Sequence, residues 1–323
     1  MDLKLAPADR PSFSPERCIN RRQRRVVCRR CADICPRGVF SLERGSGLRW
    51  DHCTDCGLCV ANCPSRCFTP SGSMQEEFTG QDLSRPLVLA CRKSEAEAQI
   101  RLRCLAAAPW ELLTLYAVRT ELVLCTGACR DCGEEAWKGC LQENLKALEN
   151  FLGDRYPARI RITEQDEVQP EDTRERDDKT LNRRELFAGL KKAAVKTAVR
   201  ETAKKLSFPA FREDDGMRWR ELLAETVARE TGNQPERRYG VDLPQFSVRC
   251  DGCGICEKIC PQQAIRLGES RDGARMVYVT PWKCTGCSLC EKLCFKQGIA
   301  GIRTIRVPRL TELPLVRIQT GRE

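Results

Sequence analysis

The sequence has one histidine, His52, and only 6% aromatic residues. It has no uncharged apolar run of the roughly 18 residues that a membrane span needs; the most apolar stretch, residues 104–118, contains Pro109 and Glu111. Residues 1–18 lack the apolar segment, about 7–15 residues long, of a secretory leader. The arginine pairs at 21–22 and 183–184 precede no long apolar run. We therefore expect a cytoplasmic chain without a transmembrane segment, whose thiols stay reduced.

Known substrate-binding motifs are also missing. Neither a dinucleotide-binding nor a phosphate-binding glycine fingerprint occurs. With a single histidine, the chain has few means to activate a cysteine nucleophile. We accordingly predict no catalytic residue.

Cysteine, by contrast, is abundant, with 23 residues. Near the end of the chain the spacing C-x2-C-x2-C-x3-C occurs twice. The eight residues are Cys250, Cys253, Cys256, Cys260, Cys284, Cys287, Cys290 and Cys294. Three cysteines at steps of three wrap one turn of chain around a cubane, whose remaining iron takes a ligand from elsewhere. Glycines within the runs, such as Gly252 and Gly286, let the backbone approach closely because they lack a Cβ. The spacing therefore indicates [4Fe–4S] clusters.

Zinc and disulfides are the alternatives at these runs. Zinc prefers two C-x2-C pairs separated by a longer loop, and a third cysteine two residues further on has no place in that site. Disulfides between neighbouring thiols of one tight loop would be strained. Both alternatives fit the spacing less well than cubanes do.

The two runs resemble those of bacterial-type two-cluster ferredoxins, in which the fourth cysteine of each run ligates the other cluster. The resemblance implies two ligand sets: Cys250, Cys253, Cys256 and Cys294, and Cys284, Cys287, Cys290 and Cys260. Residues 264–284 predict two short strands joined by a glycine-containing turn. One departure from that family is Phe295, which stands where proline is usual.

The N-terminal region contains the same unit in an altered form. Residues 53–64, CTDCGLCVANCP, have the full spacing, whereas the upstream run has Arg25 at its first position, and Cys18 lies seven residues earlier. We interpret this as an insertion, because a longer loop between Cys18 and Cys28 costs little entropy. The form resembles ferredoxin-type proteins with C-x9-C-x2-C-x3-C-P. The resemblance implies the sets Cys18, Cys28, Cys31 and Cys63, and Cys53, Cys56, Cys59 and Cys35. The alternative is a cluster that lacks one protein ligand, with Cys18 free.

Two further residues of this region could be mistaken for ligands. Cys67 follows the last cysteine of its run by four positions, where the other three runs have valine, alanine and glycine. We expect it to be a small buried residue beside the cluster. His52, just before Cys53, is expected to form a hydrogen bond or lie at the surface. A proton-coupled effect on the neighbouring potential is the alternative.

Residues 86–140 contain six more cysteines in another arrangement. Apolar segments at 86–90 and 121–125 predict two strands, and residues 107–119 predict a helix between them. We therefore expect a small α/β domain with cysteines at the ends of its strands.

The spacing of these cysteines resembles that of thioredoxin-like [2Fe–2S] ferredoxins. The stretch from Cys104 to CTGACRDC is also similar to the delta subunit of methyl-viologen-reducing hydrogenase, whose family passes electrons to heterodisulfide reductase. The resemblance implies a [2Fe–2S] cluster with the ligands Cys91, Cys104, Cys125 and Cys129, any of which Cys132 or Cys140 could replace. A redox-active dithiol, or structural or zinc-binding cysteines, are the alternatives.

Residues 154–245 contain no cysteine. Their first part, 154–179, is charged and predicts an exposed linker. Residues 181–206 have apolar residues at helical spacing and a basic opposite side, which predicts a helix with a solvated face; docking on a partner or a membrane surface is the alternative. A second helix is predicted at 219–230, and we expect these helices to pack against the ferredoxin units or to separate them.

The net charge of the protein depends on whether clusters are bound to its cysteines. A charge of +10 could indicate nucleic-acid binding, but four oxidised cubanes with their thiolates would add about −8. We therefore expect no nucleic-acid partner, and interpret the excess of arginine and lysine as compensation for bound anions, with some left for docking.

Together these observations predict an α+β, polyferredoxin-type chain in which two ferredoxin-like dicluster units flank a small α/β domain and a helical linker. The expected boundaries are 1–76, 84–153, 154–245, 246–303 and a tail at 304–323. The expected function is that of an electron-transfer subunit, relaying single electrons through four [4Fe–4S] clusters and one [2Fe–2S] cluster between redox enzymes of the hydrogenase, dehydrogenase or reductase type. The alternatives are a reductase with catalytic thiols in the middle domain, and clusters that only staple a scaffold.

Overall fold

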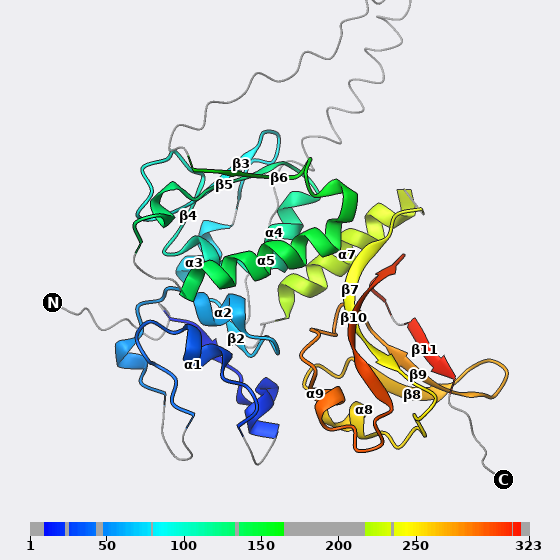
Figure 1. Ribbon diagram of the computed structural model, residues 1–323. Coiled ribbons are helices and arrows are strands. Elements are labelled where there is room, and N and C mark those ends of the chain that lie inside the picture. The colour runs from blue at the N-terminus through cyan, green and yellow to red at the C-terminus, as the bar shows by residue number, and fades with distance from the viewer. Residues whose placement is uncertain are drawn as a thin grey trace, which may run out of the picture.

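The computed structural model describes residues 10–22, 26–42, 48–78, 80–132, 136–164, 217–233, 236–311 and 313–317. Helices and strands are interspersed along these residues, which confirms the mixed α+β class. Figure 1 shows an N-terminal unit (residues 10–78), an α/β domain (80–164) above it, and a C-terminal unit (236–317) beside both. None of the helices described is long and apolar enough to cross a membrane. The basic helix predicted at 181–206 lies outside the described residues.

The N-terminal unit is built of short elements around its cysteines. They are β1 (Ser12–Phe13), α1 (Arg30–Ile34), α2 (Leu58–Asn62), β2 (Phe68–Thr69) and α3 (Gly72–Glu77). Strand β1 pairs antiparallel with β2, so that the beginning and the end of the cysteine region lie side by side. Helices α1 and α2 are each followed by a cysteine in extended conformation, Cys35 and Cys63.

The C-terminal unit repeats this arrangement with longer strands. Its elements are β7 (Tyr239–Phe246), α8 (Ile255–Ile259), β8 (Ile265–Glu269), β9 (Arg275–Val279), α9 (Leu289–Lys292), β10 (Ile299–Val307) and β11 (Leu313–Arg317). Strand β7 pairs antiparallel with β10, as β1 does with β2, and β8 and β9 form the predicted hairpin. Strand β11, in the region expected to be a tail, adds to β9.

The α/β domain between the two units has a parallel sheet in the order β4-β3-β5-β6. Its elements are β3 (Leu87–Cys91), β4 (Ile100–Leu102), α4 (Trp110–Ala117), β5 (Leu122–Cys125), α5 (Ala136–Leu152) and β6 (Ile160–Thr163). Strands β3 and β5 and helix α4 confirm the predicted strand–helix–strand unit. Strand β6 falls in the stretch predicted to be a charged linker, because its IRIT sequence pairs along β5 at the edge of the sheet.

The two faces of this sheet are buried by different parts of the chain. Leu87, Leu89 and Cys91 point into the main core, which also contains buried residues of helices α4 and α5. Val88 and Ala90 point to the other face, where Ala96 of the β3–β4 connection covers them. Burial on both faces explains why the strands of this sheet are continuously apolar.

The C-terminal unit, and helix α7 (Arg218–Asn233) that precedes it, pack against the α/β domain. Helix α7 packs against α4, and the β7–β10 ribbon reaches helix α5. At the ribbon, the rings of Tyr239 and Phe151 lie 5.2 Å apart. A Cβ on Gly240 would lie only 2.0 Å from the carbonyl oxygen of Asn150, so the backbones of β7 and α5 approach too closely for any other residue.

Candidate metal centres

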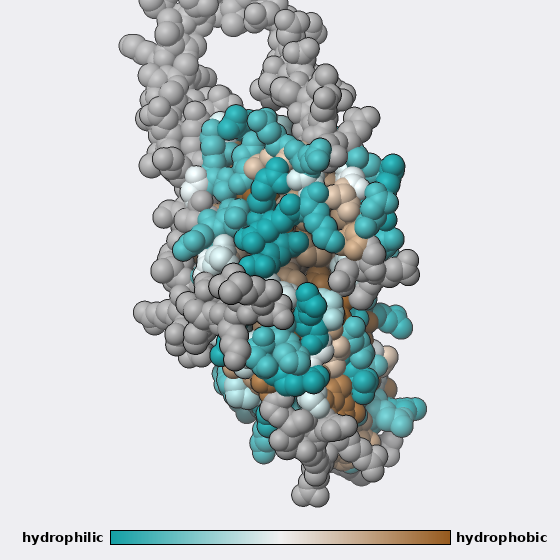
Figure 2. Space-filling model, turned by 90° about the vertical axis from the view of Figure 1, so that its left-hand side faces the viewer, coloured by the Kyte–Doolittle hydropathy of each residue, from teal (hydrophilic) through white to brown (hydrophobic). Residues whose placement is uncertain are grey.

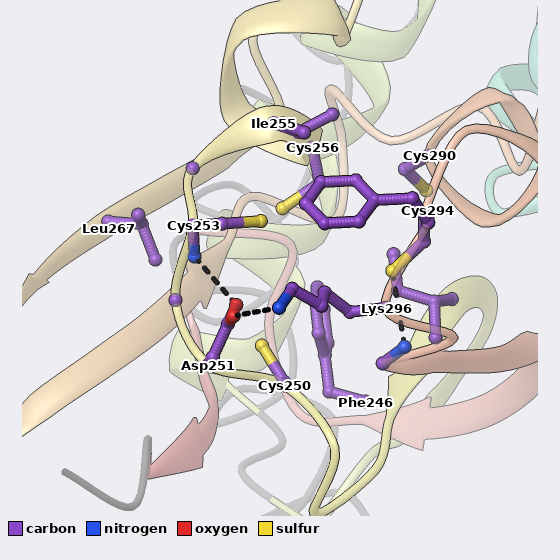
Figure 3. Close-up of a pocket in the computed structure, with 15 residues that line it drawn as sticks. Phe246, Cys250, Asp251, Cys253, Ile255, Cys256, Leu267, Cys290, Cys294 and Lys296 are labelled. Carbon is purple, nitrogen blue, oxygen red and sulfur yellow. Dashed lines mark hydrogen bonds and ion pairs between the residues drawn. The ribbon is translucent and has the colours of Figure 1, made fainter.

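The first group of cysteines lies at the outer end of the C-terminal unit. Figure 3 shows the sulfur atoms of Cys250, Cys253, Cys256 and Cys294 directed into one pocket. The first three come from the loop before α8 and its first turn, and Cys294 comes from the far end of α9. Burial and the neighbouring thiolates raise the pKa of Cys256 to about 11. The structure thus brings together one of the expected sets.

The second group of the C-terminal unit is more buried. Burial raises the pKa values of three cysteines, and the nearby Cys260 thiolate raises the same three values by a smaller effect. They are Cys284, Cys287 and Cys290. For Cys284 the two effects raise the pKa to about 12. Cys260 therefore lies with the three cysteines of the other run, as the cross-ligation rule implies.

The N-terminal unit contains a group of the same kind. One pocket is lined by Cys35 together with Cys53, Cys56 and Cys59, which is the expected set. Burial raises the pKa of Cys56 to about 11, and the thiolates of Cys35 and Cys53 act in the same direction.

The other N-terminal group depends on the insertion after Cys18. Burial, and after it the nearby thiolates of Cys63, Cys28 and Cys18, raise the pKa of Cys31 to about 12, which places all four residues near one another. The side chain of Asn20 holds the insertion in place: its Oδ1 accepts the N–H groups of Val27 and Cys28, both at 3.0 Å. The loop therefore returns Cys18 to the group, as the insertion hypothesis requires.

All four runs end in the same turn. Three residues after the fourth cysteine the backbone has a positive φ, at Gly38 (58°), Arg66 (49°), Gln263 (50°) and Gln297 (51°). The N–H of the next residue then points back at the cysteine sulfur. These bonds join Val39 to Cys35 at 3.5 Å, Cys67 to Cys63 at 3.4 Å, Ala264 to Cys260 at 3.3 Å, and Gly298 to Cys294 at 3.2 Å. The turn after Cys294 forms despite Phe295, so the missing proline does not change the backbone there.

Cys67 adds a fifth thiol to one of these groups. Its sulfur lies 3.3 Å from that of Cys63, and its side chain also bonds to Cys18. The hydrogen bonds from Cys67 lower the pKa values of Cys18 and Cys63, whereas they raise the pKa of Cys67 itself. Cys67 therefore fits a protonated thiol whose single S–H is shared between the sulfurs of Cys18 and Cys63.

The cysteines of the α/β domain do not all meet. Cys91, Cys104, Cys129 and Cys132 lie near one another: Cys91 and Cys129 affect the pKa of Cys104, and Cys91 and Cys132 that of Cys129. They follow the carboxyl ends of strands β3, β4 and β5, where loops of parallel sheets gather sites. Lys93 Nζ donates to Cys132 at 3.4 Å.

Two other cysteines of this domain lie elsewhere. Cys125 pairs in register with Ala90 and points to the opposite face of the sheet, where it is fully buried. The alternation of side chains along a strand explains this placement, because Cys91 and Cys125 occupy positions of opposite parity in neighbouring strands. Cys140 lies on helix α5 and donates to the carbonyl of Ala106 at 3.5 Å.

The group in the α/β domain adjoins the N-terminal unit. The thiolate of Cys56 is near enough to raise the pKa of Cys104. Gly57, at the start of α2, has a φ of 75°, and a Cβ there would lie 2.8 Å from the Cβ of Ala107. The two cysteine loops are therefore packed directly against each other.

Two polar residues lie beside the N-terminal groups. Asp55 is buried next to Cys53, and its Oδ2 accepts hydrogen bonds from Ser71 and Ser73 at 2.9 and 3.0 Å. Burial raises the pKa of this carboxyl. His52 lies at the surface with its side chain 47% exposed, 3.5 Å from Asp51.

Three charged residues with little solvent exposure, to which the sequence gives no role, connect the parts of the molecule. They are Arg66, Glu111 and Arg220, which form one ion network. The indication in the sequence is Glu111, a carboxylate in the middle of the most apolar segment. A buried charge of this kind requires a charged partner, although the sequence does not reveal which one.

The donor sets fit iron–sulfur clusters. Each group has four thiols, its loops approach through glycines or positive φ, and a backbone N–H points at the fourth cysteine sulfur of each of the four runs. These are the features that hold a cluster and tune its potential. Among the residues described, no three His, Cys, Asp or Glu side chains are arranged to hold a single metal ion.

A family model described as a 4Fe-4S dicluster domain matches residues 249–297, which include both C-terminal runs. The chain therefore contains an iron–sulfur domain of the [4Fe–4S] type with two implied clusters, and a general role in electron transfer is supported. None of the curated proteins and none of the solved structures matches the chain.

Proposed function

We propose that this protein is an electron-transfer subunit that relays single electrons between redox enzymes through four [4Fe–4S] clusters and one [2Fe–2S] cluster. The proposal is carried by the repetition, at four places, of the same turn and the same N–H···S hydrogen bond after the fourth cysteine. Two of these places belong to the matched dicluster domain. The two in the N-terminal unit have the same geometry, which supports a second dicluster unit there.

For the four cubanes we propose the sets expected from the sequence. They are Cys18, Cys28, Cys31 and Cys63; Cys53, Cys56, Cys59 and Cys35; Cys250, Cys253, Cys256 and Cys294; and Cys284, Cys287, Cys290 and Cys260. For the [2Fe–2S] cluster the geometry favours Cys132 over Cys125, so its set is Cys91, Cys104, Cys129 and Cys132.

Iron analysis under anaerobic conditions tests this assignment. We expect about 18 iron and a similar amount of acid-labile sulfide per chain, and EPR signals of both cluster types after reduction. About 16 iron would remove the binuclear cluster, and about 8 would leave only the C-terminal pair. A colourless protein with stoichiometric zinc would contradict the proposal.

The competing function is a reductase with catalytic thiols in the α/β domain. An attacking thiol needs thiolate character at neutral pH, but burial raises the pKa of Cys104 to about 12 and that of Cys129 to about 11. Neither thiol therefore has the thiolate character that a reactive dithiol needs at neutral pH. Alkylation separates the two functions: iron-bound thiols should resist iodoacetamide until the iron is chelated, whereas a catalytic dithiol should react as soon as it is reduced.

The partners we propose are subunits of larger redox enzymes. The face shown in Figure 2 is mostly hydrophilic at the height of the α/β domain, with hydrophobic residues interspersed lower down, at the height of the N-terminal unit. In the C-terminal unit, Val248 and Phe295 next to the first cysteine group are 83% and 63% exposed. Exposed apolar residues beside a cluster suit transient docking of a redox partner.

A further inference from the structure

A buried ion network joins three parts of the chain that are distant in sequence. Arg66 lies three residues after Cys63 in the N-terminal unit, Glu111 lies in α4 of the α/β domain, and Arg220 lies in α7. Nε and Nη2 of Arg66 donate to the Glu111 carboxylate at 3.1 and 3.0 Å, and Nη1 of Arg220 donates to it at 2.7 Å. The three side chains are only 12%, 2% and 8% exposed.

Each arginine also binds the backbone of a proposed ligand. Nη1 of Arg66 donates to the carbonyl of Cys63 at 2.9 Å. Nη2 of Arg220 donates to the carbonyl of Cys284 at 2.6 Å, and its Nε to that of Trp282 at 2.7 Å. A continuous series of charge-assisted hydrogen bonds therefore runs from a ligand loop of one unit to a ligand loop of the other.

The two units also touch directly at this point. The side-chain amide of Gln262 donates to the carbonyl of Ser65. Both residues stand two positions after the fourth cysteine of their run, so the contact joins corresponding places in the two units. The ligand loops that end at Cys63 and Cys260 therefore face one another across the network.

The charges of the network do not cancel. Two guanidinium groups share one carboxylate, so a positive charge remains, and it is withdrawn from water. Burial alone would raise the pKa of Glu111, but Arg66 and Arg220 hold it below its ordinary value, so the carboxylate is ionised at neutral pH. A cation in a poorly screened site acts strongly on neighbouring charges, and an electron added to a nearby centre is stabilised by it.

We propose that Arg66, Glu111 and Arg220 form a positively charged junction that holds the ligand loops of Cys63 and Cys284 together and raises the reduction potentials of the two centres bound there. Electrons that pass from one unit to the other would then cross at this junction. The inference rests on the proposed function, because it assumes a centre in each of these two groups. The three residues are positioning residues and do not take part in ligation.

The sign of the potential shift tests this proposal. In EPR-monitored redox titrations of the anaerobically purified full chain, Arg220→Gln should lower the potential of the nearest [4Fe–4S] centre. Glu111→Gln, which keeps a hydrogen-bond acceptor but removes the negative charge, should raise it. We expect a change of about tenfold in the ratio of reduced to oxidised centre, equivalent to about 59 mV for one electron. Centres further from the junction should shift less.

A matched control lies on the same helix. Arg229 of α7 is 73% exposed and pairs with Glu225, so Arg229→Gln removes the same charge from a solvated site and should leave all potentials unchanged. If Arg220→Gln fails to fold with its iron, the upward shift of Glu111→Gln decides alone.

Two negative results have different meanings. Shifts of the same sign in both variants, or no shift although the iron content is complete, would overturn the junction and leave the proposed function intact. A wild-type protein without reducible [4Fe–4S] centres would overturn both.

Discussion

The role of each cysteine depends on the direction in which the backbone turns its side chain. Cys125 and Cys129 are four positions apart, yet one is buried beneath the sheet and the other lies in the loop above it. Cys67 follows Cys63 at the same distance and is directed at the cluster group. Spacing alone does not separate these cases, whereas strand register and turn geometry do.

We predict that Cys132→Ser removes the [2Fe–2S] cluster while Cys125→Ala keeps it. Cys132 lies with the other three thiols of the group, whereas Cys125 packs against Ala90 and Val123. Iron should fall by about two per chain in the first variant and stay constant in the second, as measured by iron analysis and by the EPR signal of the binuclear centre. The reverse pattern would restore Cys125 as the ligand.

We also predict that Cys67→Ala retains the full iron content. Its single S–H is shared between the sulfurs of Cys18 and Cys63, and removing this interaction should lower the potential of that centre, because hydrogen bonds to the sulfurs stabilise the more negative reduced cluster. Cys63→Ala is the contrasting variant and should lose the cluster. Loss of iron in Cys67→Ala would show that this cysteine is itself a ligand.

At the scale of single residues, the local spacing of the cysteines is enough to predict which thiols gather in four groups. That these groups hold cubanes stays a prediction. The network of Arg66, Glu111 and Arg220 could not be predicted, since its members are brought together by the packing of three separate parts of the chain.

At the scale of elements, the predicted hairpin of the C-terminal unit, strands β3 and β5, and helices α4 and α7 are confirmed. Helix α5 was not predicted, although its sequence has apolar residues such as Leu141, Leu148 and Leu152 at helical spacing and buried in the core. Strand β6 is not predicted, because it is only four residues long, partly exposed and set in a charged segment. It becomes a strand by pairing with β5. Edge strands of this kind depend on tertiary contact more than on propensity.

Docking of the β7–β10 ribbon on helix α5 should be sensitive to one methyl group. Because the Cβ of an alanine at position 240 would meet the Asn150 carbonyl at 2.0 Å, we expect Gly240→Ala to destabilise the protein by about 1–3 kcal/mol. Denaturant unfolding monitored by circular dichroism measures the change.

The matched control uses a glycine of helix α5, against which Gly240 of β7 packs. Gly139 of α5 has open space around it, so Gly139→Ala should stabilise the protein by up to about 1 kcal/mol through helix propensity. Equal stabilities of the two variants would contradict the close approach of β7 to α5.

At the scale of the whole molecule, the charge of the chain depends on its clusters. The formal net charge of +10 counts the thiols as neutral. Four cubanes would lower it by about 8, and an oxidised [2Fe–2S] centre with four thiolates by about 2 more. On the proposed cluster count, the excess of basic side chains would therefore be balanced by the bound clusters.

We therefore predict that the isoelectric point falls when the clusters are present. The sequence alone gives a value near 8.7, whereas the charge of the loaded protein is close to zero at neutral pH. Anaerobic isoelectric focusing of the brown protein and of the same protein after iron chelation measures the difference. Equal values for the two forms would contradict the cluster count.

The small direct contact between Gln262 and Ser65 has a consequence for assembly. Two separate units would need a large and specific interface to meet in one orientation, but covalent connection raises the effective concentration of each unit at the other. The α/β domain, against which α7 and the β7–β10 ribbon pack, then orients the two units, and their own contact can stay small.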